Sequence, residues 1–226
     1  MSQPRSARFE LQTAFAVPIG RAEHPGPAPL NRDLRGLFLE REQAGDRYRN
    51  PDPTMNIRPG LFESRFDLFD WTDPPIAELR AFCWSALFKT VSDLSGYAPQ
   101  DMNRLEVRST AWFHVTRRGG YFGQHNHPMA SWSGVYCVDA GDDRSGHPES
   151  GALVFAHPFG MATAFTDLGN ARLRDPWGVR PLSLTLKPGE LVIFPSWLMH
   201  QVMPYQGDGE RITVAFNAWF RQRAAA

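Results

Sequence analysis

Three histidines have the residue type and the spacing of metal ligands. His125 and His127 are two residues apart in the segment HNHP, and on an extended chain residues with this spacing project from the same face. His200 lies in the apolar segment FPSWLMHQVMP, where an imidazole without a partner would be costly. Three neutral imidazoles suit Fe(II), Zn, Cu or Ni and leave coordination positions open. The pattern therefore predicts a metal site.

The other four of the seven histidines carry weaker signals. His24, His147 and His157 each precede a proline, and His114 follows Trp112 in an alternating segment that predicts a strand. We expect these imidazoles to be solvated or hydrogen-bonded side chains, although His114 and Trp112 are also candidates for a substrate pocket.

Arg211 begins a second alternating segment, RITVAFNAWF, eleven residues after His200. On a strand it would share a face with Thr213, Ala215 and Asn217. The small neighbours leave room for a ligand, and a guanidinium binds a carboxylate through two parallel hydrogen bonds. An arginine at a strand end on the surface is the alternative. Beside the three histidines, the carboxylate-binding interpretation is favoured.

Strands and two helices must position these residues. Asn31 reads as the start of a helix, and a clearer helix runs from Asp73, its expected N-cap, to Gly96. An early strand is expected at 11–19, and further strands at 107–115, 132–138, 152–156, 182–186, 191–194, 200–203 and 212–220. Many short strands predict a mostly β fold, a sandwich or small barrel with flanking helices. We expect one domain over 1–226, with a strand and bracing helices in 1–104 and the core in 105–220.

Composition excludes several functional classes. The 226 residues are 42% hydrophobic and 21% charged, as in a globular protein. Lys+Arg and Asp+Glu are both 24, so no basic surplus predicts nucleic-acid binding. No apolar run is long enough to span a membrane, and the start does not resemble a signal peptide. Cys83 and Cys137 are expected to be buried thiols, so a cytoplasmic location is predicted.

Several segments together resemble a known family. HNHP, SGVYCVD, GALVF, LKPGELVIFPSWLMHQVMP and ERITVAFNAWF are similar to segments of the Fe(II)- and 2-oxoglutarate-dependent oxygenases. Within that superfamily the chain resembles an uncharacterised bacterial group with a His-x-His…His motif. AWFHVTRRGG and AFAVPI fit the same group. The resemblance implies a double-stranded β-helix (a jelly-roll, cupin-like core) that uses Fe(II), 2-oxoglutarate and O2.

The resemblance also implies roles for individual residues. His125 and His127 fall where the superfamily has a His-x-Asp pair, and His200 matches its distal histidine. Arg211 matches the residue that binds the far carboxylate of 2-oxoglutarate. The tyrosine that often touches this cosubstrate corresponds to Tyr136 or Cys137, and Thr213 is a further contact on the Arg211 face.

His127 is the main departure from the superfamily pattern, because most members have a carboxylate there. Without it, iron should bind less tightly when 2-oxoglutarate is absent. If His127 turned away from the metal, the site would resemble that of the halogenases.

The implied reaction is hydroxylation of a small amino acid or natural-product-like molecule, with release of succinate and CO2; desaturation and halogenation stay open. Candidates for substrate contact are Trp112, His114, Trp132, Asn217 and Arg172. Two alternatives remain: a cupin-like three-histidine dioxygenase or isomerase that does not use 2-oxoglutarate, and a non-catalytic ligand-binding β-barrel. A homodimer is possible.

Overall fold

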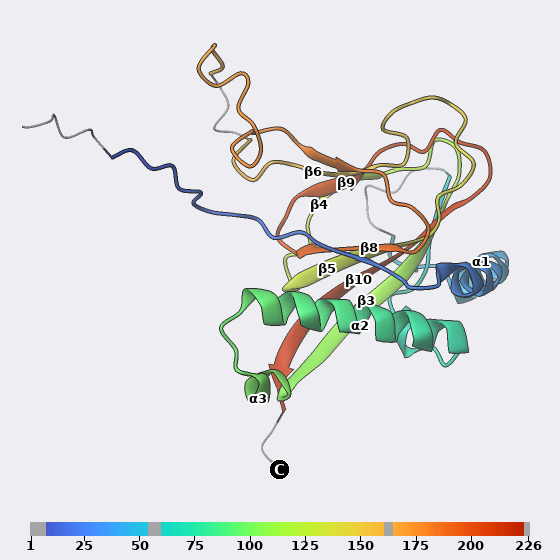
Figure 1. The fold of residues 1–226 in the computed structure, drawn as a ribbon. Helices are drawn as coiled ribbons and strands as arrows, with labels where there is room; N and C mark the ends of the chain where they lie inside the picture. Colours follow the sequence, from blue (N-terminus) through green and yellow to red (C-terminus); the bar gives the residue numbers. More distant parts are fainter. Residues whose placement is uncertain (1–7, 54–59, 161–164, 224–226) are drawn as a thin grey trace, which may run out of the picture.

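Two antiparallel sheets face each other in the computed structural model, which describes residues 8–53, 60–160 and 165–223. The larger sheet has the strand order β1-β8-β5-β10-β3-β2, and the smaller has the order β4-β9-β6-β7 (Figure 1). The strands are β1 (Gly20–Glu23), β2 (Leu61–Glu63), β3 (Leu105–Thr116), β4 (Phe122–His125), β5 (Trp132–Asp139), β6 (Leu153–Phe155), β7 (Leu182–Leu184), β8 (Glu190–Pro195), β9 (His200–Val202) and β10 (Arg211–Gln222).

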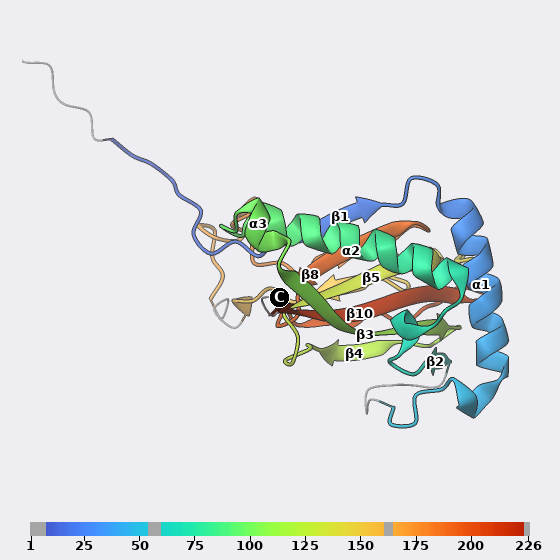
Figure 2. The same cartoon turned by 90° about the horizontal axis from the view of Figure 1, so that it is seen from below.

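Helices cover the outer face of the larger sheet (Figure 2). The long helices are α1 (Pro27–Gln43) and α2 (Pro74–Leu94), and the short ones are α3 (Pro99–Met102), η1 (Gly45–Arg47) and η2 (Leu68–Asp70). The apolar stripe of α2, with Leu79, Cys83 and Leu87, is buried against the sheet. Because the helices cover this face, the opposite face is left to form a pocket with the smaller sheet.

Alternation along β3 and β10 separates the core from the pocket. Phe113 and Val115 belong to the core under the helices, whereas Trp112 and His114 line the pocket. In the antiparallel register Thr213 lies opposite His114 and Ala215 lies opposite Trp112, so these side chains share one face of the sheet. A second, smaller core that includes Leu153 and Phe194 lies between the two sheets.

Two local predictions are wrong. Residues 11–19 form no strand, and β1 begins only at Gly20. Phe15 is 86% exposed, and only the end of the segment, with Val17 and Ile19, packs against the smaller core. Asn31 is not a cap but lies inside α1, which begins at Pro27. A proline fits the first turn of a helix, where its missing N–H costs nothing. No helix in the described ranges combines the length and the apolar character needed to cross a membrane.

Candidate metal and anion site

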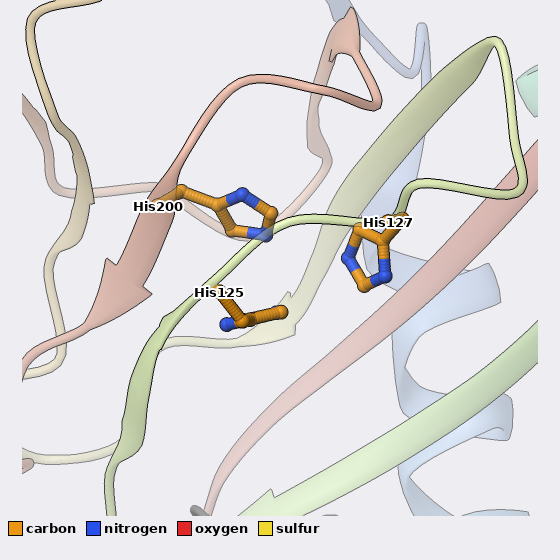
Figure 3. A group of neighbouring side chains, drawn as sticks. All are labelled: His125, His127 and His200. Atoms are coloured by element: carbon orange, nitrogen blue, oxygen red, sulfur yellow. The ribbon is translucent and has the colours of Figure 1, made fainter.

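The structure brings His125, His127 and His200 together. β4 ends at His125 and β9 begins at His200, and the two residues are directly paired across these strands. One ligand nitrogen from each of the three side chains lies within 4.8 Å of the others (Figure 3). His127 follows β4, and its backbone N–H donates to the Ser196 carbonyl at 2.8 Å. The loop is thereby fixed with the third imidazole facing the other two.

Hydrogen bonds and burial prepare the imidazoles to bind a cation. Nδ1 of His125 donates to the Gly123 carbonyl at 2.7 Å, and Nδ1 of His200 donates to the Leu198 carbonyl at 2.8 Å. Nε2 of each ring therefore keeps its lone pair. Burial, with a smaller contribution from neighbouring histidines, lowers the pKa of His127 to about 4 and that of His200 to about 3. Burial also lowers the pKa of His125, so all three are neutral at pH 7.

Arg211 is buried beside this group without an anionic partner. It is only 6% exposed, and the described residues offer its guanidinium neither a hydrogen bond nor an ion pair. Burial lowers the pKa of Arg211, yet a guanidinium stays charged in proteins. A buried, unpaired charge is costly, which indicates that a bound anion completes this part of the site.

The surroundings of Arg211 hold it in place. Arg35 of α1 binds Asp139 at 2.8 Å and Glu210 at 2.7 Å, and so anchors the start of β10. Gly151 has a φ of +61°, and a Cβ there would lie 2.8 Å from Cδ of Arg211. The glycine therefore leaves the space that the guanidinium stem occupies.

One pocket connects the histidine group with Arg211. Its other lining residues are mainly apolar or small and include no acidic side chain: Trp112, His114, Phe122, Ser133, Gly134, Val135, Leu153, Phe194, Val202, Thr213, Ala215 and Phe216. An elongated molecule could therefore contact a metal at one end and Arg211 at the other. Thr213 and Ala215 lie on the Arg211 face that the alternation predicts.

The structure corrects the expectation for Tyr136. Its side chain is fully buried on the helix face of the larger sheet, where the hydroxyl donates to Oδ1 of Asn31 at 2.7 Å. Cys137 points between the sheets, but its Sγ contacts the Leu186 carbonyl at 3.6 Å and does not line the pocket. Tyr136 is therefore not placed to touch a ligand there, whereas Cys137 lies close enough to Arg211 for the guanidinium charge to act on the pKa of its thiol.

Some of the candidates for substrate contact lie at the pocket and others do not. Trp112 and His114 line the pocket, and Asn217 lies beside it, where its Oδ1 accepts a hydrogen bond from Ser133 at 2.7 Å. Trp132 packs instead against the core under the helices. Arg172 is exposed on a long loop and does not line this pocket, so the structure does not join these two to the site.

Sequence reasoning missed Glu63 and Gly151. Glu63 is 3% exposed, and its carboxylate lies 3.0 Å from Nε2 of His114. It belongs to a strand of three residues, too short for a recognisable alternation. Gly151 has a positive φ, but the sequence shows only that a glycine stands at this position and not what backbone conformation it adopts.

Comparisons with known proteins agree with this geometry. Residues 110–217 match a family described as "Putative 2OG-Fe(II) oxygenase". A prolyl-4-hydroxylase from Pseudomonas putida has a similar structure, with a TM-score of 0.60, 20% identity and coverage of 92% of this chain and 94% of that one. None of the curated proteins matches the chain.

Two further structures share the fold. HygX from Streptomyces hygroscopicus, with nickel and 2-oxoglutarate bound, has a TM-score of 0.56 at 15% identity, covering 89% of this chain and 82% of that one. The carbocyclase SnoK from nogalamycin biosynthesis has a TM-score of 0.59 at 11% identity, covering 92% and 82%. The expected mostly β jelly-roll core is confirmed. The matched segment 110–217 holds His125, His127, His200 and Arg211, so this part of the chain is similar to the 2OG-Fe(II) oxygenases, a family of oxidoreductases that use Fe(II), 2-oxoglutarate and O2.

Proposed function

We propose that His125, His127 and His200 hold the iron of this oxygenase and that Arg211 binds the far carboxylate of 2-oxoglutarate. The observation that carries the proposal is the buried, unpaired guanidinium of Arg211 in the same pocket as the three histidines. The donor set fits a divalent metal, because three unprotonated imidazole nitrogens converge within 4.8 Å.

In this family, iron and 2-oxoglutarate, when bound, supply an oxidation by O2 that is coupled to loss of CO2 and formation of succinate. The residues of this chain bind and orient the reactants. The imidazoles offer three ligand positions, and Arg211 fixes the distal end of the cosubstrate by charge-assisted hydrogen bonds. Leu153, Phe194 and Val202 line the pocket and exclude water from it, which strengthens the interaction between Arg211 and the carboxylate.

We further propose that the reaction is hydroxylation of a small amino acid or natural-product-like substrate. HygX has been captured with hygromycin B, and a prolyl hydroxylase from Trichoplax adhaerens with a peptide, so both substrate classes occur on this fold. A zero net charge supports a partner other than nucleic acid or an anionic membrane. The buried, unpaired Cys83 and Cys137 support a reducing compartment such as the cytoplasm, and a homodimer stays possible.

The first experiment is an anaerobic titration of metal-free protein with Fe(II) and 2-oxoglutarate, monitored by the weak visible charge-transfer band of the chelate. We expect the band in the wild type and its loss in His127→Ala and Arg211→Ala. Arg32→Ala removes an exposed guanidinium from α1 and is the matched control that should keep the band.

Each of the other outcomes would contradict a different part of the proposed function. Tight binding of Zn(II) or Ni(II) without any band would favour the cupin-like three-histidine enzyme. Unchanged binding of 2-oxoglutarate in Arg211→Ala would refute the cosubstrate site. Absence of metal binding altogether would leave a ligand-binding barrel.

A further inference from the structure

The pocket face of β10 continues past the histidine group to Asn217. Arg211 and Ala215 line the pocket, and Asn217 is the next residue after Ala215 on the same face of the strand. Ala215 lies opposite Trp112, and the ring centroid of Trp112 is 5.9 Å from that of His127. Asn217 therefore stands about 7 Å further along the strand than Ala215, at the end of the pocket away from Arg211.

Two buried serines connect Asn217 with the loop that carries His127. The Ser133 hydroxyl donates to Oδ1 of Asn217 at 2.7 Å, and the same oxygen lies 2.8 Å from the Ser196 hydroxyl. The backbone carbonyl of Ser196 accepts the N–H of His127 at 2.8 Å. Ser133 is 2% exposed and Ser196 is fully buried. The side chain of Asn217 is thus held by the residue that also holds the third histidine in place.

The number of protons along this hydrogen-bonded chain decides how the amide is turned. A serine hydroxyl has one proton, and Ser133 gives its proton to Asn217, so Ser196 must be the donor to Ser133. If the amide were reversed, Nδ2 of Asn217 would donate to Ser133 and Ser133 would donate to Ser196. The Ser196 proton would then have no acceptor in the part of the chain that the structure describes. Because a buried hydroxyl without an acceptor is costly, the amide keeps its oxygen on the serines.

Nδ2 of Asn217 is left as a donor at the outer end of the pocket. Asn217 is half-buried, and among the described residues none accepts a hydrogen bond from its Nδ2. The residues opposite it, Thr110 of β3 and Ser133 of β5, are uncharged. The ring of Trp112 lies 4.5 Å from that of Phe66, which is 41% exposed. A ligand that enters here therefore meets an oriented amide donor beside an aromatic wall.

We propose that Nδ2 of Asn217 binds an acyl oxygen of the substrate, in a carboxylate or an amide, and that Ser133 and Ser196 are positioning residues that turn the amide for this contact. The inference rests on the proposed function, because it assigns the space between Arg211 and the metal to 2-oxoglutarate. The space beyond the metal is then left for the substrate, whose acyl group would be held there.

A panel of small molecules tests the acyl preference without knowledge of the natural substrate. Each amino acid is compared with its primary amide and with the amine that lacks the acyl group, so that amide and amine carry the same charge. The protein is loaded with Ni(II) and saturated with 2-oxoglutarate, and it cannot turn over. Thermal melts over a concentration series give the affinities. We expect compounds that bind to favour the amide over the amine about fivefold and the acid over the amine roughly 10- to 100-fold.

Three variants assign this preference to the amide of Asn217. In Asn217→Leu the donor is lost, so the three forms of a compound should bind within about threefold of one another. In Asn217→Asp the donor becomes an anion, which should favour the amine and the amide over the acid. Ser133→Ala lets the intact amide turn and should reduce the preference toward that of Asn217→Leu. Asn103→Asp changes an exposed amide that follows α3 and is the matched control, which should keep the wild-type preference.

The melt with 2-oxoglutarate alone separates the two levels of the proposal. If 2-oxoglutarate does not stabilise the Ni(II)-loaded wild type, the proposed function itself fails. If it does, but no acid or amide of the panel binds, or the amine binds as tightly as the amide, only the role of Asn217 fails. A preference that persists in Asn217→Leu would overturn that role as well, and one that is unchanged in Ser133→Ala would overturn the positioning by the serines.

Discussion

Replacing Arg211 by methionine should stabilise the ligand-free protein while abolishing cosubstrate binding. The guanidinium is 6% exposed and is unpaired in the described part of the chain. Burying a polar group without a partner costs about 1–3 kcal/mol in mutational data, and Met is a flexible, unbranched side chain that can fill the space of the arginine stem. With about 2–4 °C for each kcal/mol in a chain of this size, the melting temperature should rise by roughly 2–12 °C.

The same change should remove the ligand-dependent part of the stability. Losing a buried charged partner of a carboxylate costs about 3–5 kcal/mol, which corresponds to a loss of roughly two to three and a half orders of magnitude in affinity. Thermal melts of the Ni(II)-loaded protein with and without saturating 2-oxoglutarate measure both effects. A variant that melts at or below the wild-type temperature without ligand, or that 2-oxoglutarate still stabilises, would refute the reasoning.

Further predictions concern Gly151, the pH dependence set by the histidines, and Tyr136. Gly151→Ala should weaken 2-oxoglutarate binding at least tenfold in calorimetry, because the added Cβ would lie 2.8 Å from Cδ of Arg211; unchanged affinity would contradict the packing. Affinity for Ni(II) should fall less between pH 7 and about pH 5 than it would for three solvated imidazoles, because burial lowers the pKa values of all three ligands, those of His127 and His200 to about 4 and about 3. The metal-free fold should meanwhile become less stable below about pH 6.5, since the unfolded histidines then bind protons that the folded ones do not. Tyr136→Phe should leave 2-oxoglutarate binding unchanged, because the Tyr136 hydroxyl donates to Asn31 and not to a ligand. Losing this hydrogen bond should lower the free energy of unfolding, measured with denaturant, by about 1 kcal/mol. Weaker 2-oxoglutarate binding in this variant would mean that Tyr136 belongs to the binding site.

The sequence predicted the elements whose pattern is local. Alternation around Phe113 indicates β3 and the faces of its side chains, and the stripe that follows Asp73 indicates α2. The strand expected at 11–19 failed for a non-local reason. β1 is the polar segment Gly20–Glu23, which is a strand because it pairs with β8, and no periodicity within four residues reports a partner so far along the chain. The assignment of 1–226 to one domain stays a prediction.

At the site, residue type and spacing were sufficient to identify the side chains whose chemistry is unusual for their surroundings. An imidazole in an apolar segment and an arginine leading an alternating strand have few structural roles, and His200 and Arg211 indeed share a pocket. The choice between Tyr136 and Cys137 depends on register, because a slip of one residue exchanges the two faces of a strand. The pairing of β10 with β5 contains such an irregularity between Ile212 and Thr213, which the sequence does not reveal.

Charge balance connects the three-histidine arrangement with the anion that it requires. The pocket lining contains no acidic side chain, and Arg211 is its formally charged residue. A divalent cation held by neutral imidazoles would add two positive charges in a region where burial makes charge costly. A carboxylate at position 127 would offset part of that charge, but His127 cannot. The buried carboxylate of Glu63 lies beside His114, and its charge acts on His125, so it offsets part of this charge. A dicarboxylate ligand would add negative charge at both ends, beside the metal and beside Arg211. Metal and cosubstrate should consequently reinforce each other's binding, since each reduces the electrostatic cost of the other.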